Sequence, residues 1–292
     1  QIKGIKEGTV FVGLMKPYQN TELLKDLAKK KVTTLALELI PRISRAQAMD
    51  VLSSQSNLAG YKAVVDSAAE YGRAIPLMMT AGGTIPPARV LVLGAGVAGL
   101  QAIATAKRMG AVVSAFDVRP AVKEQVESLG ASFVAVEADE ASDGGGGYAK
   151  EMSDDYKCRQ SEKLAEVIKA QDIIVTTALI PGKPAPVLIT ADMVKSMKEG
   201  SIIYDLAAEN GGNCELTEFG KVITKQGVKI IGYANVPSRI GFDASQVFGR
   251  NIFNLLKIMV DSNASLAINF DDEIIKGCCL THDGAIVHPN FL

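Results

Sequence analysis

The sequence predicts an α/β protein of two domains, each built on a doubly wound parallel sheet, with the first domain truncated at its N-terminal side. Three observations support this prediction. A glycine-rich turn separates an apolar strand from an apolar helix within residues 89–110, as in a βαβ unit. After residue 89, a helix ending near a small residue is followed by a buried strand five times. The length of 292 residues corresponds to about two domains.

Composition narrows the class of protein. Hydrophobic residues make up 48% and charged residues 22% of the chain, which is ordinary for a globular protein with a substantial core. A net charge of −1 provides no general basic field, so no nucleic-acid partner is expected. The four cysteines form no C-x-x-C pair and there are only two histidines, which predicts reduced thiols and no metal site. Residues 90–106 are uncharged but too short and glycine-rich to span a membrane.

The N-terminal segment predicts a small parallel sheet. Residues 9–14 and 32–39 have the composition of strands, and a helix capped by Asn20 or Thr21 connects them. Two strands are few for a parallel sheet, so we expect missing strands upstream of Gln1 and help from the C-terminal end. The lack of an initiator methionine agrees with a chain that begins inside a domain.

A polar corner follows the second of these strands. Arg42, Gln47, Asp50 and Ser53 lie close together in the sequence, and burying such a cluster is costly unless it serves a ligand or a partner. A solvated loop that caps the next helix is the alternative. We expect that helix to end before Pro76 and to connect the first domain to the second. We expect a first domain of residues 1–55 with 237–292, and a second of residues 56–236.

The glycine turn predicts a dinucleotide site of the Rossmann-like kind. Gly94 permits a tight turn, Gly96 lets the backbone approach a pyrophosphate, and Gly99 lets the helix pack closely on the strand. Asp117 ends the next strand, 23 residues after Gly94, where an acid can bind the adenosine ribose. Asp117 could instead cap a helix, and Arg119 nearby could receive the 2′-phosphate of NADP.

The remaining segments predict how the site is completed. Ligands of doubly wound sheets lie beyond the carboxyl ends of the strands, which points to the turns at 177–182 and 209–212. Residues 137–157 are polar and glycine-rich, and predict either a lid carrying Tyr148 or a plain linker. A helix is expected at 243–260. Strands around the turn His282-Asp283-Gly284 are expected to return to the first domain or to pair with another subunit.

Seven segments together resemble one known family. They are PRISRAQAMDVLSSQSNLAGY, GAGVAGLQAIATAKRMGA, KEQVESLGA, GGYAKEMSD, TTALIPGKPAPVLIT, DLAAENGGNCE and DGAIVHP. They closely resemble the NAD(H)-binding component, domain I, of proton-translocating nicotinamide nucleotide transhydrogenase. A more distant similarity connects the chain to alanine dehydrogenase of the same superfamily. The resemblance covers essentially the whole chain.

The resemblance implies two Rossmann-like domains with NAD(H) in the cleft between them. It further implies Re/Si-specific hydride transfer between NAD(H) and NADP(H) on a partner domain, coupled to proton translocation. The implied partners are an NADP(H)-binding domain, a transmembrane proton-channel domain and a second copy of the chain in a homodimer. The implied location is the cytoplasmic face of a bacterial-type membrane or the matrix face of an organelle inner membrane, for a soluble domain without a span of its own.

The resemblance also assigns residues. The family's R-x4-Q-x2-D-x2-S site beside the nicotinamide matches Arg42, Gln47, Asp50 and Ser53, with Ile43 and Ser44 inside it. The other cofactor-binding positions that match are Gly94, Gly96, Val97, Gly99, Asp117, Val118, Arg119, Gly147, Tyr148 and Leu179.

Two other functions remain open at this point. An alanine dehydrogenase-like oxidoreductase is the first, but that family uses a histidine just after the strand at residues 10–14, and none occurs there. A non-catalytic NAD-sensing module is the second, and it would need no polar corner facing another cofactor.

Overall fold

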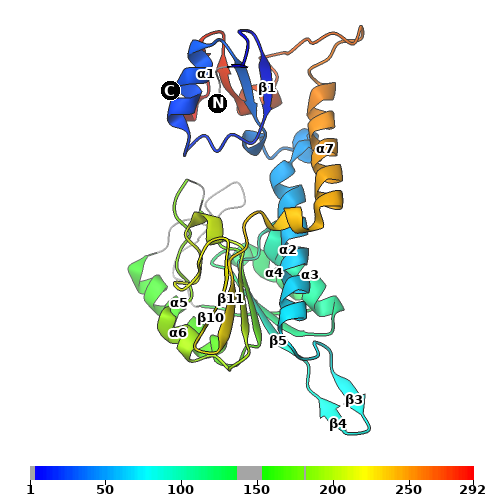
Figure 1. The fold of residues 1–292 in the computed structure, drawn as a ribbon, viewed down its shortest axis with the longest axis vertical. Helices are drawn as coiled ribbons and strands as arrows, with labels where there is room; N and C mark the ends of the chain where they lie inside the picture. The colour runs from blue at the N-terminus through cyan, green and yellow to red at the C-terminus, as the bar shows by residue number, and fades with distance from the viewer. Residues whose placement is uncertain (1–3, 137–152, 181) are drawn as a thin grey trace. The chain divides into compact units, whose positions relative to one another are not determined.

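The computed structural model describes residues 4–136, 153–180 and 182–292. The chain forms two units, one of Gln1–Gln55 with Phe242–Leu292 (unit 1) and one of Ser56–Gly241 (unit 2). Two helices run from one unit into the other, α2 (Val51–Glu70) and α7 (Gly241–Lys257), and both are labelled in Figure 1. The predicted helix at 243–260 is therefore confirmed, with slightly earlier bounds.

Unit 1 contains a four-stranded sheet in the order β1-β2-β12-β13. β1 and β2 are parallel, whereas β12 is antiparallel to β2 and β13 is antiparallel to β12. The C-terminal strands thus return to the first domain, which was one of the two expected outcomes. The elements are β1 (Val10–Gly13), α1 (Thr21–Lys29), β2 (Thr33–Ala36), η2 (Leu37–Leu39), η3 (Ser44–Met49), α8 (Glu273–Cys278), β12 (Cys279–His282), β13 (Ala285–Ile286) and η7 (Pro289–Phe291).

The predicted strand at residues 32–39 was too long. β2 ends at Ala36, and the chain then turns through η2. The side chain of Glu38 explains the turn, because its Oε1 accepts hydrogen bonds from the backbone N–H of Met15 at 2.7 Å and of Lys16 at 2.6 Å. A straight strand would not bring that carboxylate to the loop after β1.

Unit 2 is built on a seven-stranded sheet in the order β10-β11-β9-β8-β5-β6-β7. Every neighbouring pair is parallel except β10 and β11 at one edge. The strand order reverses between β5 and β8, as in doubly wound folds. The elements are β5 (Arg89–Leu93), α3 (Val97–Arg108), β6 (Val112–Phe116), η4 (Pro120–Val122), α4 (Lys123–Ser128), β7 (Ser132–Phe133), α5 (Asp154–Ile168), β8 (Ile173–Thr176), α6 (Ala191–Lys195), β9 (Ile202–Asp205), η5 (Ala208–Asn210), β10 (Val222–Lys225), β11 (Val228–Ile231) and η6 (Val236–Ile240).

Both faces of this sheet are buried, so alternate residues of one strand pack into the cores on opposite sides of it. In β5, Val90 and Val92 belong to a core cluster that includes residues of α2 and α3. Leu91 and Leu93 point the other way, into a cluster with residues of α5 and α6. This arrangement explains why the central strands read as unbroken hydrophobic runs and confirms the predicted α/β fold class.

Three local predictions were wrong or incomplete. The hairpin of β3 (Met78–Thr80) and β4 (Gly83–Ile85) lies after Pro76, in a stretch for which no strand was predicted. β10 replaces the helix expected before the strand at the KQGVKIIGY segment. Residues 154–157, expected in a loop, open α5, because Ser153 caps that helix by accepting from the Tyr156 N–H.

A buried polar cluster fastens α2 within unit 2. Asp66, on α2, accepts hydrogen bonds from Lys62 at 2.6 Å, from Arg239 Nε at 2.9 Å and from the Tyr204 hydroxyl at 3.1 Å. Burial alone would raise the pKa of Asp66, but the hydrogen bonds from Lys62 and Arg239 outweigh it and lower the pKa below its ordinary value. The Arg239 guanidinium also lies 3.9 Å from the centroid of the Tyr233 ring.

Candidate functional site

The glycine turn between β5 and α3 is shaped by contacts that exclude side chains. Gly94 has φ of 99°, and a Cβ there would lie 2.5 Å from Thr177 Oγ1. A Cβ on Gly99 would overlap the carbonyl oxygen of Gly94. Only glycine therefore fits at these two positions, the first for its backbone conformation and the second for close packing.

Gly96 differs from its two neighbours, because a Cβ there would meet nothing within 4 Å. Gly96 is the N-cap of α3, and no side chain caps this helix end among the described residues. The helix has 12 residues and begins at Val97, which is 40% exposed. Uncapped N–H groups and the helix dipole fit an anionic pyrophosphate.

This helix end lies where the strand order reverses. The turn after β5 and the segment after β8 are adjacent, since Thr177 N donates to Leu93 O at 2.8 Å and Thr177 Oγ1 donates to Gly94 O at 3.1 Å. Crevices at such switch points, outside the carboxyl ends of the strands, are the usual ligand sites of doubly wound sheets. The residues present therefore fit a dinucleotide.

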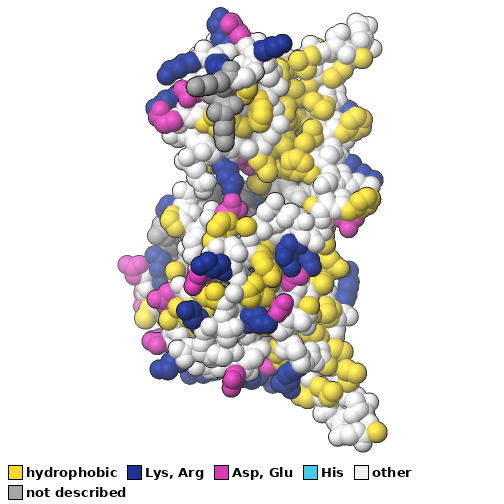
Figure 2. Space-filling model, viewed as in Figure 1, with side chains coloured by type: hydrophobic (Ala, Val, Ile, Leu, Met, Phe, Trp, Pro, Cys, Tyr) yellow, Lys and Arg dark blue, Asp and Glu magenta, His cyan; other side chains and the backbone are white. Residues whose placement is uncertain are grey.

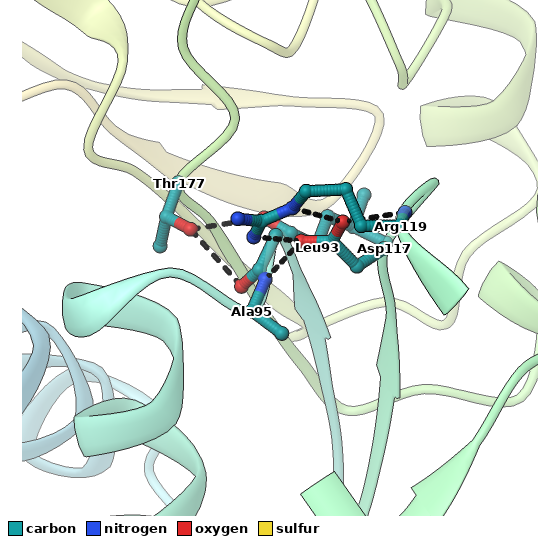
Figure 3. A network of polar contacts seen from close by, with 6 residues as sticks. Leu93, Ala95, Asp117, Arg119 and Thr177 are labelled. Atoms are coloured by element: carbon teal, nitrogen blue, oxygen red, sulfur yellow. Dashed lines mark hydrogen bonds and ion pairs between the residues drawn. The ribbon is translucent and has the colours of Figure 1, made fainter. Parts of the chain in front are cut away.

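Asp117 is fully engaged by protein groups (Figure 3). Its Oδ2 accepts from Ala95 N at 2.7 Å and from Arg119 Nη2 at 2.8 Å, and its Oδ1 accepts from Arg119 N and Arg119 Nε, both at 2.9 Å. The side chains of Asp117 and Arg119 are only 7% and 11% exposed. A carboxylate has about four acceptor sites, so these four donors fill it.

Arg119, named above as a possible receiver of the 2′-phosphate of NADP, is the main partner of the Asp117 carboxylate. Asp117 joins the end of β6 to the glycine turn through Ala95 and does not act as a helix cap in this arrangement. A ribose hydroxyl that bonds to Asp117 must displace or share one of the present donors.

Two other predicted cofactor residues of unit 2, Val118 and Leu179, follow strands β6 and β8. Val118 lies between Asp117 and Arg119 and is half-buried. Leu179 follows β8 and is 40% exposed. Gly147 and Tyr148 lie outside the described residues.

The polar corner lies in unit 1, within η3 and the start of α2. Asp50 and Ser53 are in contact, with Ser53 N and Ser53 Oγ donating to the Asp50 carboxylate at 2.9 and 2.6 Å. This contact is an N-terminal helix cap, so the alternative of a capping role holds for that pair. Arg42, Ser44 and Gln47 are exposed, whereas Ile43 is half-buried.

The segment is held in place by its apolar side and by one neighbouring arginine. Ala46 and Met49 are buried in the core of unit 1. Arg45 makes two hydrogen bonds of 2.8 Å with the Asp272 carboxylate, at the start of α8. Exposed Gln47 is therefore carried by a well-packed turn.

Thr177, in the predicted turn at 177–182, contacts the glycine turn of unit 2. Sequence reasoning missed two residues beside it, Asp205 and Asn213, which hold the segment after β8 from within the protein. The sequence signal that could have found them is an acid at the carboxyl end of a buried strand, Asp205, followed by the pair Gly211-Gly212. The described residues contain no cluster of His, Cys, Asp or Glu suited to a metal ion, and no described helix is long and apolar enough to cross a membrane.

Comparison with known proteins gives the family. Residues 1–59 match "Alanine dehydrogenase/PNT, N-terminal domain", and residues 63–289 match "Alanine dehydrogenase/PNT, C-terminal domain". The chain belongs to the alanine dehydrogenase/PNT family. An NAD(P) transhydrogenase alpha-subunit protein of Rhodospirillum rubrum is 58% identical over 288 residues, which are 98% of this chain and 75% of that protein.

Solved structures agree with this membership in the alanine dehydrogenase/PNT family. The crystal structure of transhydrogenase from Sinorhizobium meliloti is similar with a TM-score of 0.88 and 53% identity, covering 98% of this chain and 77% of that one. L-alanine dehydrogenase is similar with a TM-score of 0.75 and 23% identity, covering 98% and 74%, which shows the shared fold. The resemblance found in the sequence is confirmed, and the chain carries the NAD-binding, Rossmann-type domain of this oxidoreductase family.

Proposed function

We propose that this chain is the NAD(H)-binding component of a proton-translocating, Re/Si-specific transhydrogenase. The observation that carries the proposal is the N-terminus of α3 beside Gly96, which no described side chain caps and which lies where the strand order of unit 2 reverses. A nicotinamide dinucleotide fits there through its pyrophosphate. The 58% identity to a transhydrogenase subunit over 98% of the chain favours this role over other oxidoreductases.

The chemistry that NAD(H) supplies when bound is hydride transfer, which requires no general base from the protein. The residues of this chain bind the dinucleotide and orient its nicotinamide. The glycine turn holds the pyrophosphate, Asp117 binds the ribose, and Leu179 lies over the dinucleotide. Arg42 and Gln47, exposed on a packed turn, position the nicotinamide for transfer to NADP(H) on the partner. Correct positioning can contribute several kcal/mol to lowering a barrier of this kind.

The proposed partners follow from the same assignment. They are an NADP(H)-binding domain and a transmembrane proton-channel domain, with this chain at the cytoplasmic or matrix face of the membrane. A second copy of the chain is also proposed. The β3–β4 hairpin supports it, because Leu77, Met78 and Met79 are exposed by 58%, 44% and 85%, and Figure 2 shows hydrophobic side chains along it. A two-stranded hairpin with such side chains is marginal unless it is covered.

The substitution Gln47→Asn tests the proposed transfer site. It shortens the side chain without changing its charge or chemistry, so NADH affinity should be nearly unchanged. Hydride transfer should slow by about 10-fold or more, the signature of an interaction made at the transition state. Stopped-flow transfer with the NADP(H)-binding partner measures the rate, and fluorescence titration measures the affinity.

Gln226→Asn provides the matched control. Gln226 is exposed in the turn between β10 and β11, at the edge of the unit 2 sheet, and the same change there should alter neither quantity. Wild-type transfer by the Gln47→Asn protein would remove Gln47 from the site. Absence of transfer by the unmodified chain with its partner would overturn the proposed function.

The alternative function, an alanine dehydrogenase-like oxidoreductase, needs a proton acceptor beside the substrate. Both histidines lie in the C-terminal segment of unit 1 and contact protein groups. His282 is stacked on Phe270 with ring centroids 3.8 Å apart, and His288 Nδ1 accepts from Asn290 N at 3.3 Å. Robust alanine-dependent reduction of NAD by the isolated chain would nevertheless establish this activity.

A further inference from the structure

Asp205 is a carboxylate at the carboxyl end of β9 that is 0% exposed. Its Oδ1 accepts from Thr176 Oγ1 at 2.9 Å and Ala207 N at 3.0 Å, and its Oδ2 accepts from Asn213 N at 2.8 Å, Cys214 N at 3.1 Å and Thr217 Oγ1 at 2.6 Å. A buried charge is tolerated only when hydrogen bonds replace its hydration. Asp205 therefore fixes the positions of the groups that surround it.

The Gly211-Gly212 pair brings Asn213 to this carboxylate. Both glycines have positive φ, 102° and 85°. A Cβ on Gly212 would lie 2.8 Å from Asp205 Oδ2. The backbone can pass this close to the carboxylate only without a side chain.

Asn213 is also 0% exposed, and its side-chain amide is hydrogen-bonded to the segment that follows β8. Oδ1 accepts from Ala178 N at 2.9 Å, and Nδ2 donates to Ala178 O at 2.9 Å and to Pro186 O at 2.8 Å. One side chain thus satisfies both backbone groups of Ala178, as a neighbouring strand would. The partners determine the amide orientation, since an N–H faces Oδ1 and two carbonyl oxygens face Nδ2.

The segment that follows β8 is adjacent to the glycine turn. Thr176 bonds to Asp205, Thr177 bonds to Gly94 O, and Ala178 bonds to Asn213, so three successive residues are held from three sides. Leu179 is the next residue, and it is exposed. Two of the groups that set the position of the segment before Leu179, the side chains of Asp205 and Asn213, are fully buried.

We infer that Asn213, supported by Asp205, is a positioning residue that preorganises the Ala178–Leu179 segment for nicotinamide dinucleotide binding. The inference rests on the proposed function, because Asn213 and Asp205 act on that ligand only through the segment after β8. Without Asn213, ligand binding would have to order this segment. The ordering cost of one backbone residue weakens NADH binding by about 10-fold.

The test compares Asn213→Ala with Thr217→Val. Asn213→Ala removes the three side-chain hydrogen bonds to Ala178 and Pro186. Thr217→Val removes a buried hydrogen bond to Asp205, but the Thr217 hydroxyl donates its single hydrogen to Asp205 and so gives none to the Ala178 segment. Calorimetric titration with NADH should show about 10-fold weaker binding for Asn213→Ala and a change below about 2-fold for Thr217→Val. Hydrogen exchange at Ala178 N–H should accelerate only in Asn213→Ala, a readout that does not depend on activity. Thermal melts establish how much each variant is destabilised.

Each result decides the inference. If both variants lose affinity in proportion to their loss of stability, or if Asn213→Ala binds NADH like the unmodified protein, the inference is overturned while the proposed function stands. If the unmodified chain itself does not bind NADH, the proposed function falls and the inference with it. If the alanine variant does not fold, the same measurements are made on Asn213→Ser, which keeps one hydroxyl at this position.

Discussion

Removing the Asp117 carboxylate should destabilise unit 2 as well as weaken NADH binding. Asp117→Ala leaves the Arg119 guanidinium, 11% exposed, without the carboxylate that now accepts two of its side-chain N–H groups. Breaking a buried ion pair from one side costs about 3–5 kcal/mol. For a unit of this size each kcal/mol corresponds to about 2–4 °C, so the melting temperature should fall by roughly 6–20 °C.

The pairing itself is isolated by a double-mutant cycle. Arg119→Ala and Asp117→Ala/Arg119→Ala are melted alongside the single variant by differential scanning calorimetry. Because the double variant contains no unpaired charge, its loss of stability should be smaller than the sum of the two single losses, by about 0.5–3 kcal/mol. Additive losses, or a fall below about 2 °C for Asp117→Ala, would refute the assignment of a buried pair.

The preference for NADH over NADPH is tested by measuring their binding to the same variants and to the unmodified chain. In folded Asp117→Ala, loss of a hydrogen bond from ribose to a charged group should weaken NADH binding by about 10- to 100-fold. The unmodified chain should prefer NADH to NADPH, because the carboxylate repels a 2′-phosphate. Tighter binding of NADPH would show that Arg119 leaves Asp117 to receive that phosphate.

Three further outcomes are expected. Gly60→Ala should cost about 1–3 kcal/mol because its Cβ would overlap the Ala98 carbonyl oxygen, whereas Gly249→Ala, in open space on α7, should stabilise by about 0.5–1 kcal/mol; urea unfolding measures both. A maleimide at neutral pH should label only Cys158 in the native protein, since burial raises the pKa of the other three thiols, and a second labelled position would contradict this. The pKa of Asp66 is lowered in the folded state, so its stabilisation is present above about pH 4 and lost as the pH falls through the folded pKa; Asp66→Asn should flatten that region of the stability curve.

The sequence predicted what depends on local pattern. The unbroken apolar run of β5, the glycines of the turn and the acid after β6 are close together in the chain, and each has one dominant structural meaning. The doubly wound parallel sheet of unit 2 was predicted from the repetition of such strand and helix units.

Contacts between side chains could not be predicted in the same way. Asn213 and Ala178 are 35 residues apart, and their bond depends on where two turns meet. The pairing of Asp117 with Arg119 depends on side-chain directions after β6, which a spacing of two residues does not determine. The β3–β4 hairpin was missed because flanking prolines and the Gly82-Gly83 turn gave it the composition of a linker.

Unit 1 is made from two stretches of chain with all of unit 2 between them. Its β2 strand pairs with β12, where Thr281 Oγ1 donates to Val32 O at 2.8 Å. During synthesis on the ribosome, every strand of unit 2 is complete before Thr281 has been added. Unit 2 can therefore fold first, while β2 still has an open edge that is available for wrong pairing. Slow translation across Phe242–Leu292 would lengthen that exposure, so nascent-chain aggregation should fall sharply once β12 leaves the exit tunnel.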